Sequence, residues 1–174
     1  IFNLLGPLTN PAGVNRFVIG VFSDELCLPF AEVLKQLCAV HVMVVHSRDG
    51  LDEFSLAAPT TVALLNDGEI TEWTLTPDEV GIPSQTLTGL VVDSSEQSLK
   101  LIKDALSRDK SKIGEKAANM IALNAGAGIY VAGITKTYKQ AVELAQDILY
   151  GGQALEKMSI LSEFTKTLKQ YQAD

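Results

Sequence analysis

The chain has 174 residues, with 21 acidic side chains against 14 basic ones and a formal net charge of −7 at pH 7. With 47% hydrophobic and 20% charged residues, the composition is typical of one ordered globular unit with a substantial core. The acidic balance argues against a nucleic-acid partner, because neutralising phosphates requires a surplus of Lys and Arg. No apolar run approaches the roughly 20 residues that cross a bilayer, so we expect no membrane partner either.

The first segment of the chain has hydrophobic residues but neither a helical nor a strand period. Turns are predicted at Gly6-Pro7 and Asn10-Pro11. Because Gly6 and Pro7 fix a compact backbone, the segment from Asn3 to Asn10 could form one wall of an apolar pocket for an aromatic ring. A buried loop at the end of a sheet would have the same sequence pattern. The segment carries no pattern of a signal peptide, and we expect a cytoplasmic protein.

The next part of the chain predicts a βαβ unit. Residues 17–22 and 42–45 are short continuous apolar runs, typical of strands that are covered on both faces. The segment between them predicts an amphipathic helix that would carry Cys27 and Cys38 on one face. Two strands joined by a crossover helix should be parallel. Both cysteines are expected to be small buried residues in a reducing compartment.

A hairpin and four helices are predicted for the remainder. Residues 62–65 and 70–75 flank an Asp67-Gly68 pair, whose tolerance of positive φ favours a tight antiparallel turn. The expected helices cover residues 93–107 (with Leu99, Ile102 and Leu106 facing inward), 112–133, 135–150 and 153–170. The predicted fold class is therefore α/β, with a partial central sheet, a βαβ unit, an antiparallel hairpin excursion and a helical C-terminal half.

The helix predicted over residues 112–133 is rich in glycine and alanine. Glycine costs a helix about 1 kcal/mol relative to alanine, so this run suggests close contact with another backbone, a ligand or a helix break. Asn124 within it either contacts a ligand or serves the packing between helices.

The strongest chemical signal is the pair Asp52-Glu53, which follows the second predicted strand. Open α/β sheets bind ligands at the carboxyl ends of their strands. Adjacent carboxylates on a loop can bind a hard divalent cation through oxygen, and with Asp49 nearby the loop suits Mg²⁺ held against a polyphosphate. A solvated acidic loop is the alternative. His46, at the end of the same strand, could donate to a phosphate or simply bond to the backbone.

Other catalytic signatures are missing from the sequence. It contains no glycine-rich phosphate-binding motif and no nucleophile elbow. The residues alone therefore indicate a metal–polyphosphate loop and no complete catalytic set.

Three segments together resemble one family. Residues 1–11, Asp49–Glu53 and Leu123–Ala127 are similar, in order and separation, to motifs of the anthranilate phosphoribosyltransferases of tryptophan biosynthesis. The resemblance implies transfer of a 5-phosphoribosyl group from phosphoribosyl pyrophosphate to the amine of anthranilate, with release of pyrophosphate. It implies that Asp52 and Glu53 bind Mg²⁺, with Glu53 shared between two ions, and that the complete enzyme is a homodimer.

The resemblance also implies how much of the family is represented. It spans about the C-terminal half of the family's length, so residues 1–174 are expected to be a fragment of a single α/β domain. An N-terminal helical domain, the glycine-rich phosphate loop and an arginine that contacts anthranilate would all precede Ile1. Since positioning of the phosphates supplies much of the rate in such reactions, we expect the isolated chain to be inactive. Missing strands should also leave an apolar surface.

Three alternatives stay open. The chain could belong to an enzyme of the same fold with another acceptor, such as a nucleoside phosphorylase or a different phosphoribosyltransferase. It could be a non-catalytic homologue that binds nucleic acid, against which the net charge of −7 argues. It could also be a purely structural remnant that binds no Mg²⁺ with pyrophosphate.

Overall fold

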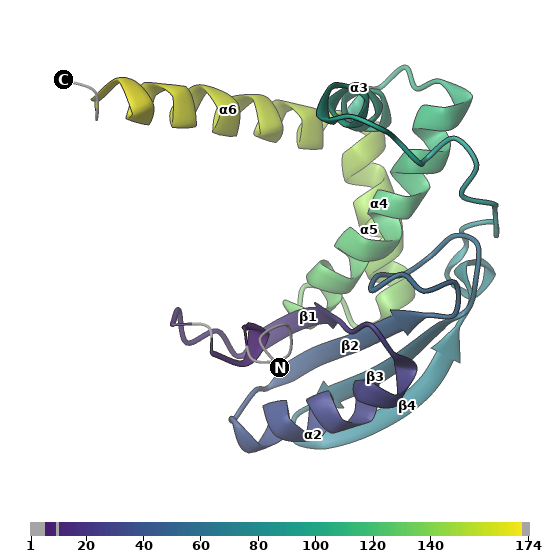
Figure 1. Ribbon diagram of the computed structural model, residues 1–174, viewed down its shortest axis with the longest axis vertical. Helices are drawn as coiled ribbons and strands as arrows, with labels where there is room; N and C mark the ends of the chain where they lie inside the picture. The colour runs from purple at the N-terminus through teal and green to yellow at the C-terminus, as the bar shows by residue number, and fades with distance from the viewer. Residues whose placement is uncertain (1–5, 10, 172–174) are drawn as a thin grey trace.

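The computed structural model describes residues 6–9 and 11–171 of the chain. Among these residues, a four-stranded sheet has one helix on one face and the helical half of the chain on the other (Figure 1). The strands are β1 (Arg16–Gly20), β2 (His41–Ser47), β3 (Thr60–Asn66) and β4 (Glu69–Leu75). The helices are α2 (Cys27–Gln36), α3 (Ser95–Leu106), α4 (Lys112–Val131), α5 (Tyr138–Tyr150) and α6 (Gln153–Tyr171), with short 3₁₀ turns η1 (Pro7–Thr9), η2 (Asp24–Leu26) and η3 (Pro77–Val80).

The sheet has the order β1-β2-β3-β4. β1 and β2 are parallel and are joined through α2, which confirms the predicted βαβ unit. β3 is antiparallel to both β2 and β4. The turn between β3 and β4 consists of Asp67 and Gly68, with φ of 47° and 85°, so the predicted Asp-Gly hairpin is confirmed as well.

β2 is the central strand of the core and is buried on both faces. Its side chains alternate between two hydrophobic clusters. Val42 and Val44 pack with α2, whereas Met43 and Val45 point to the opposite face and pack with α4 and α5. All four side chains are at most 1% exposed. A continuous apolar run rather than an alternating one is the pattern that such a doubly covered strand requires.

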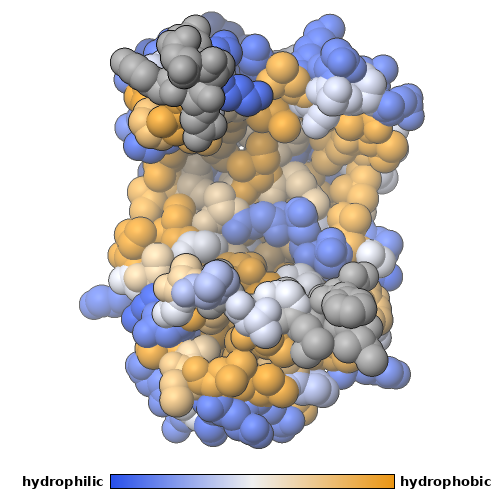
Figure 2. All heavy atoms as spheres, turned by 60° about the vertical axis from the view of Figure 1, so that its left-hand side comes forward, coloured by the Kyte–Doolittle hydropathy of each residue, from blue (hydrophilic) through white to orange (hydrophobic). Residues whose placement is uncertain are grey.

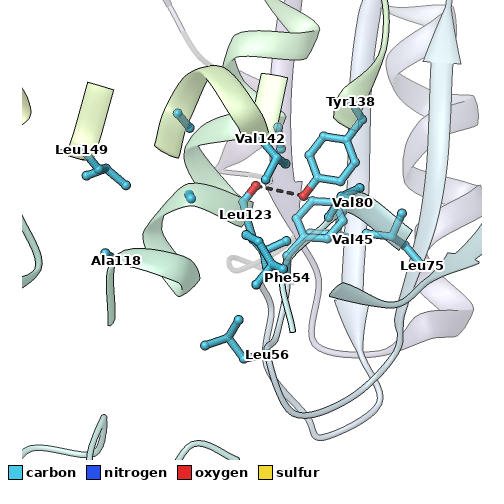
Figure 3. Packing of buried hydrophobic residues seen from close by; sticks show 14 of the residues in the cluster. Val45, Phe54, Leu56, Leu75, Val80, Ala118, Leu123, Tyr138, Val142 and Leu149 are labelled. Carbon is cyan, nitrogen blue, oxygen red and sulfur yellow. Dashed lines mark hydrogen bonds between the residues drawn. The ribbon is translucent and has the colours of Figure 1, made fainter. Parts of the chain in front are cut away.

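The small residues of α4 allow α5 to approach closely. A Cβ added at Gly126 would lie 2.7 Å from Cγ2 of Val142 and 3.0 Å from its Cα, so no larger residue fits without a shift of α5. Tyr138, at the start of α5, donates its hydroxyl to the Leu123 carbonyl at 2.9 Å (Figure 3). Close contact with the backbone of α5 is therefore the reason for glycine at position 126.

The helix predicted to carry both cysteines ends earlier than expected. α2 stops at Gln36, and Cys38 is an exposed residue with φ of 62°, whereas Cys27 is fully buried. The amides of Cys38 and Ala39 donate to the carbonyls of Lys35 and Leu34, which is the Schellman pattern of helix termination. The position with positive φ in that pattern is usually glycine, so a cysteine there did not indicate the end of the helix. The prediction that both cysteines lie on one face of a helix was therefore wrong.

The predicted inward face of α3 is also partly wrong. Leu106 is buried, but Leu99 and Ile102 are 47% and 40% exposed. α3 lies at the periphery of the molecule (Figure 1) and meets the core through the neighbouring stripe, where Ala105 is buried and Leu101 packs against the cluster. A helix at the periphery buries only a narrow stripe of its surface, and α3 has apolar residues outside that stripe.

The last helix extends away from the rest of the molecule (Figure 1). Only the beginning of α6 packs against the core, through Ala154, Leu155 and Met158. Further along, its large hydrophobic side chains are exposed: Ile160, Leu161, Phe164 and Leu168.

Figure 2 shows the hollowed side of the molecule, with hydrophobic residues gathered around the hollow. None of the described helices combines the length and the apolar character needed to span a membrane.

Candidate metal site

Asp52 and Glu53 lie in the loop that leaves the carboxyl end of β2 and leads to β3. Both side chains are exposed. The residues that follow them are not, since Phe54, Ser55 and Leu56 are at most 1% exposed. The acidic pair is thus presented to solvent by a segment that is anchored immediately behind it.

The loop is irregular, but its backbone is hydrogen-bonded. The Ser47 amide donates to the Leu51 carbonyl at 2.8 Å, and the Gly50 amide donates back to the Ser47 carbonyl at 2.9 Å. The amide of Arg48 donates to the Pro59 carbonyl at 3.0 Å, which ties the two ends of the loop together. Gly50 has φ of 90°, a conformation that favours glycine, so this tight turn depends on its identity.

Asp49 is used by the loop itself. Its Oδ2 accepts a hydrogen bond from the Ser55 hydroxyl at 2.6 Å, and its Oδ1 accepts a long one from the Leu51 amide at 3.5 Å. Burial alone would raise the pKa of Asp49, but hydrogen bonds from Ser55, Ser47 and the Leu51 amide outweigh it and hold the pKa below its ordinary value. Asp49 therefore stabilises the turn, and two carboxylates rather than three remain for a cation.

Phe54 anchors the acidic pair in the larger core. Its ring stacks on Tyr138 with centroids 5.0 Å apart (Figure 3). The backbone of the same residue is paired with the side chain of Asn124 on α4. The Phe54 amide donates to Oδ1 at 2.9 Å, and Nδ2 donates to the Phe54 carbonyl at 3.0 Å. Asn124 was predicted to touch a ligand or another helix, and its side chain instead holds this loop.

Gly20, the last residue of β1, supports the loop from the other side. A Cβ at this position would lie 1.7 Å from the backbone carbonyl oxygen of Asp52. The loop thus rests directly on the bare backbone of β1, and any other residue at position 20 would displace it. Sequence reasoning missed this contact, because a glycine in a strand can equally mark a bulge or a bend.

The carboxylates of Asp52 and Glu53 have no hydrogen-bond or ion-pair partner within the part of the chain that the structure describes. No group of three or more His, Cys, Asp or Glu side chains that could hold a metal ion occurs among the described residues. Two free carboxylates fit Mg²⁺, which is commonly bound by one or two carboxylates together with substrate phosphates and water. They do not fit a site built entirely from protein ligands.

The two histidines of β2 have structural contacts. Nδ1 of His46 donates to the Val21 carbonyl at 2.8 Å, so this side chain is bonded to the backbone, as one of the two predicted alternatives required. His41, at the start of the strand, packs edge-on against Tyr130. Burial and the nearby Arg16 guanidinium lower the pKa of His41, which favours the neutral ring. His41 is thus buried, and the half-buried His46 uses its Nδ1 for a backbone carbonyl.

The predicted pocket wall falls only partly within the residues that the structure describes. Asn3 is outside the described residues, Gly6 is exposed, and Pro7 belongs to the turn η1. The neighbouring Leu8 lines a cavity of about 240 Å³ together with Phe17 and Leu37, near the start of β1. The acidic pair lies beside Gly20, at the other end of that strand. Of the described residues, Leu8 and the acidic pair thus lie near opposite ends of β1. The role of Asn3, Gly6 and Pro7 in substrate binding stays a prediction.

The fold and the exposed carboxylates define an α/β protein with a candidate divalent-metal site at the carboxyl ends of its strands. Residues 1–155 match the model of the glycosyl transferase family, a/b domain. The chain therefore belongs to this family.

The curated relatives show which enzymes of this family the chain resembles closely in sequence. Over all 174 residues the chain is 82% identical to an anthranilate phosphoribosyltransferase of Acinetobacter baumannii, and it covers 50% of that protein. It is 58% identical over 170 residues to the anthranilate phosphoribosyltransferase of Pseudomonas syringae pv. tomato, of which it covers 49%. The chain thus spans about half the length of the curated relatives that it matches.

Solved structures agree with this grouping. The crystal structure of anthranilate phosphoribosyltransferase from Thermus thermophilus superposes with a TM-score of 0.77 at 40% identity, over 88% of this chain and 44% of that one. The Saccharomyces cerevisiae enzyme in complex with PRPP and Mg has a TM-score of 0.76 at 24% identity, over 91% of this chain and 45% of that one. At the latter identity the likeness shows the fold.

Proposed function

We propose that this chain forms part of an anthranilate phosphoribosyltransferase, in which it contributes the carboxylates that bind Mg²⁺. The complete enzyme would transfer a 5-phosphoribosyl group from phosphoribosyl pyrophosphate to anthranilate. The observation that carries the proposal is the 82% identity over the full 174 residues to a curated enzyme of that name. The exposed Asp52-Glu53 pair on its anchored loop supports it independently.

The chemistry requires little from this chain besides the acidic pair. The bond between C1 of the ribose and the pyrophosphate oxygen breaks, and a bond from C1 to the anthranilate nitrogen forms while that nitrogen loses a proton. Mg²⁺, when bound, would neutralise charge on the departing pyrophosphate. Asp52 and Glu53 would hold the cation through their oxygens, and their position at the end of β2 places them where open α/β sheets bind ligands.

The other parts of the proposal follow from the family. Because the chain covers half the length of its relatives, we propose that it is a fragment of one α/β domain and is inactive alone. We also propose that the complete enzyme is a homodimer of the cytoplasm, a reducing compartment in which unpaired cysteines such as Cys27 and Cys38 persist.

A chimera tests this function. The chain replaces the matching 174-residue segment of the Acinetobacter baumannii relative, and turnover is followed by the loss of anthranilate fluorescence with phosphoribosyl pyrophosphate and Mg²⁺. The chimera is expected to be active, and Asp52→Asn with Glu53→Gln is expected to lower activity strongly at limiting Mg²⁺. The matched control is Asp24→Asn with Glu25→Gln, a pair of the same two residue types at η2.

Two results would contradict the proposal. An inactive but folded chimera would show that this chain does not supply a working half of the enzyme. A chimera whose activity at limiting Mg²⁺ is unchanged by the Asp52 and Glu53 substitutions would show that the metal ligands lie elsewhere.

A further inference from the structure

We propose that Asn124 is a positioning residue for the candidate metal site, because its side-chain amide fixes the backbone of Phe54 and thereby the direction of Asp52 and Glu53. This inference rests on the proposed function, since it assumes that the two carboxylates bind the cation. Asn124 lies on α4, about 70 positions after the acidic pair in the chain, so it would act as a distant support of the metal ligands.

The hydrogen bonds of Asn124 restrain both polar groups of one residue. Oδ1 accepts from the Phe54 amide at 2.9 Å, and Nδ2 donates to the Phe54 carbonyl at 3.0 Å. The second hydrogen of Nδ2 goes to the Met120 carbonyl at 3.1 Å, one turn earlier on the same helix. An amide bonded in this way fixes the orientation of the Phe54 backbone as well as its position, and its own rotamer is locked by Met120.

The helix that carries Asn124 is a rigid support. The carbonyl of the preceding residue, Leu123, accepts the hydroxyl of Tyr138 at 2.9 Å, and the ring of Tyr138 stacks on Phe54 (Figure 3). Gly126 on the same helix packs closely against α5. Phe54 is therefore held by its ring through α5 and by its backbone through α4. A group supported in this way transmits its position to the residues next to it.

The acidic pair lies between two restrained residues: the Leu51 carbonyl accepts the Ser47 amide before it, and the Asn124 side chain holds the Phe54 backbone after it. Glu53 directly precedes Phe54, and neither Asp52 nor Glu53 has a side-chain partner of its own among the described residues. Gly20 limits how far the Asp52 carbonyl can move toward β1, but as a steric contact it does not orient the chain. Loss of the Asn124 amide would leave both polar groups of the Phe54 backbone without their partner and release the adjoining carboxylates.

The test uses the complete 174-residue chain with Mn²⁺ as the probe. Mn²⁺ in the presence of inorganic pyrophosphate is titrated and followed by electron paramagnetic resonance, and amide hydrogen exchange is measured at Phe54. Asn124→Leu removes all three hydrogen bonds at similar volume, and Asn124→Ala repeats the loss with a residue that favours the helix. The matched control is Asn119→Leu, because Asn119 is a buried amide on the same helix that pairs with Gln146 and not with the loop.

We expect both Asn124 substitutions to weaken Mn²⁺ binding by about tenfold or more, as is usual when support for a metal ligand is removed. They should also accelerate exchange at Phe54, while Asn119→Leu does neither. Wild-type Mn²⁺ affinity in a folded Asn124→Ala chain would overturn the inference, and so would equal weakening by Asn119→Leu. The proposed function fails separately, if Asp52→Asn with Glu53→Gln leaves Mn²⁺ binding unchanged.

Discussion

The loop between β2 and β3 is held by more contacts than its irregular backbone suggests. The helix α6 is held by fewer contacts than its regular backbone suggests. The loop has no regular structure, yet it is held by backbone hydrogen bonds, by the Asn124 amide and by the buried ring of Phe54. α6 is a regular helix of 19 residues, yet only its beginning packs against the core. Phe164, in its distal part, is 60% exposed.

The difference shows that contacts rather than regularity determine which part of this molecule is fixed in place. Helices gain most of their stability in proteins from packing of an apolar face, and the distal part of α6 has little of it. The loop satisfies its backbone polar groups and buries an aromatic ring. A functional pair of carboxylates needs a fixed position, and the loop provides one that a freely projecting helix could not.

The largest expected effect is the removal of the loop's aromatic anchor. Phe54→Ala deletes a side chain that is 1% exposed and leaves a cavity beside Tyr138, so the free energy of unfolding is expected to fall by about 4 kcal/mol. Chemical denaturation measures it. Phe22→Ala is the control, since that ring is 65% exposed and its removal is expected to change little. Equal effects of the two substitutions would contradict the contrast between anchored and exposed regions.

A smaller loss is expected where β1 supports the loop. In Gly20→Ala the new Cβ would overlap the Asp52 carbonyl, so the loop must shift, at a cost of about 2 kcal/mol in the free energy of unfolding. Gly128→Ala is the matched control, because nothing lies within 4 Å of a Cβ there and the site is helical. That control should stabilise the chain by about 1 kcal/mol. A neutral Gly20→Ala would show that the loop adapts readily.

Acid should weaken the loop through Asp49. Its pKa is depressed in the folded chain, so its contribution to stability is present above the ordinary pKa of 3.8 and is lost as the pH falls through the lower folded value. The free energy of unfolding, measured from about pH 5 down to about pH 2, should therefore fall less in Asp49→Asn than in the unaltered chain. Ser55→Ala, which removes one of the donors to Asp49, should reduce the slope by a smaller amount. Identical slopes in all three chains would refute this role of Asp49.

The smallest effect on stability is expected for α6. Leu161→Ser with Phe164→Ser changes side chains that are 61% and 60% exposed, so the free energy of unfolding should stay within about 0.5 kcal/mol of the original. Binding of a hydrophobic dye should nevertheless decrease, because these residues contribute to the exposed apolar surface of α6. Unchanged dye fluorescence would place that surface elsewhere.

Patterns that act over a few neighbouring residues could be predicted from the sequence. The Asp67-Gly68 turn is defined by its own backbone preferences, and β2 by an apolar run that only a doubly covered strand tolerates. The acidic pair was predicted in the same way, because its position in the loop after β2 follows from local order along the chain.

Features that depend on distant residues could not be predicted. Gly20 matters because the Asp52 carbonyl touches it, and Asn124 matters because Phe54 lies opposite, yet nothing near either residue in the sequence reveals its partner. The pocket wall at Asn3, Gly6 and Pro7 was predicted from the compact backbone of Gly6-Pro7, and it stays a prediction. The predicted end of α2 was wrong for a local reason, because Cys38 occupies the position with positive φ at which glycine is usual.

The exposed Cys38 and the buried Cys27 differ in their reactivity, which has a practical consequence. Burial, with Asp24 and Glu72 nearby, raises the pKa of the Cys27 thiol to about 11, and the side chain is inaccessible to solvent. Cys38 is exposed at the turn between α2 and β2. Alkylating reagents consume thiolates that they can reach, so at neutral pH they distinguish the two sulfurs. The native sequence already contains one selective attachment point for a fluorophore, at the end of the molecule where β2 begins.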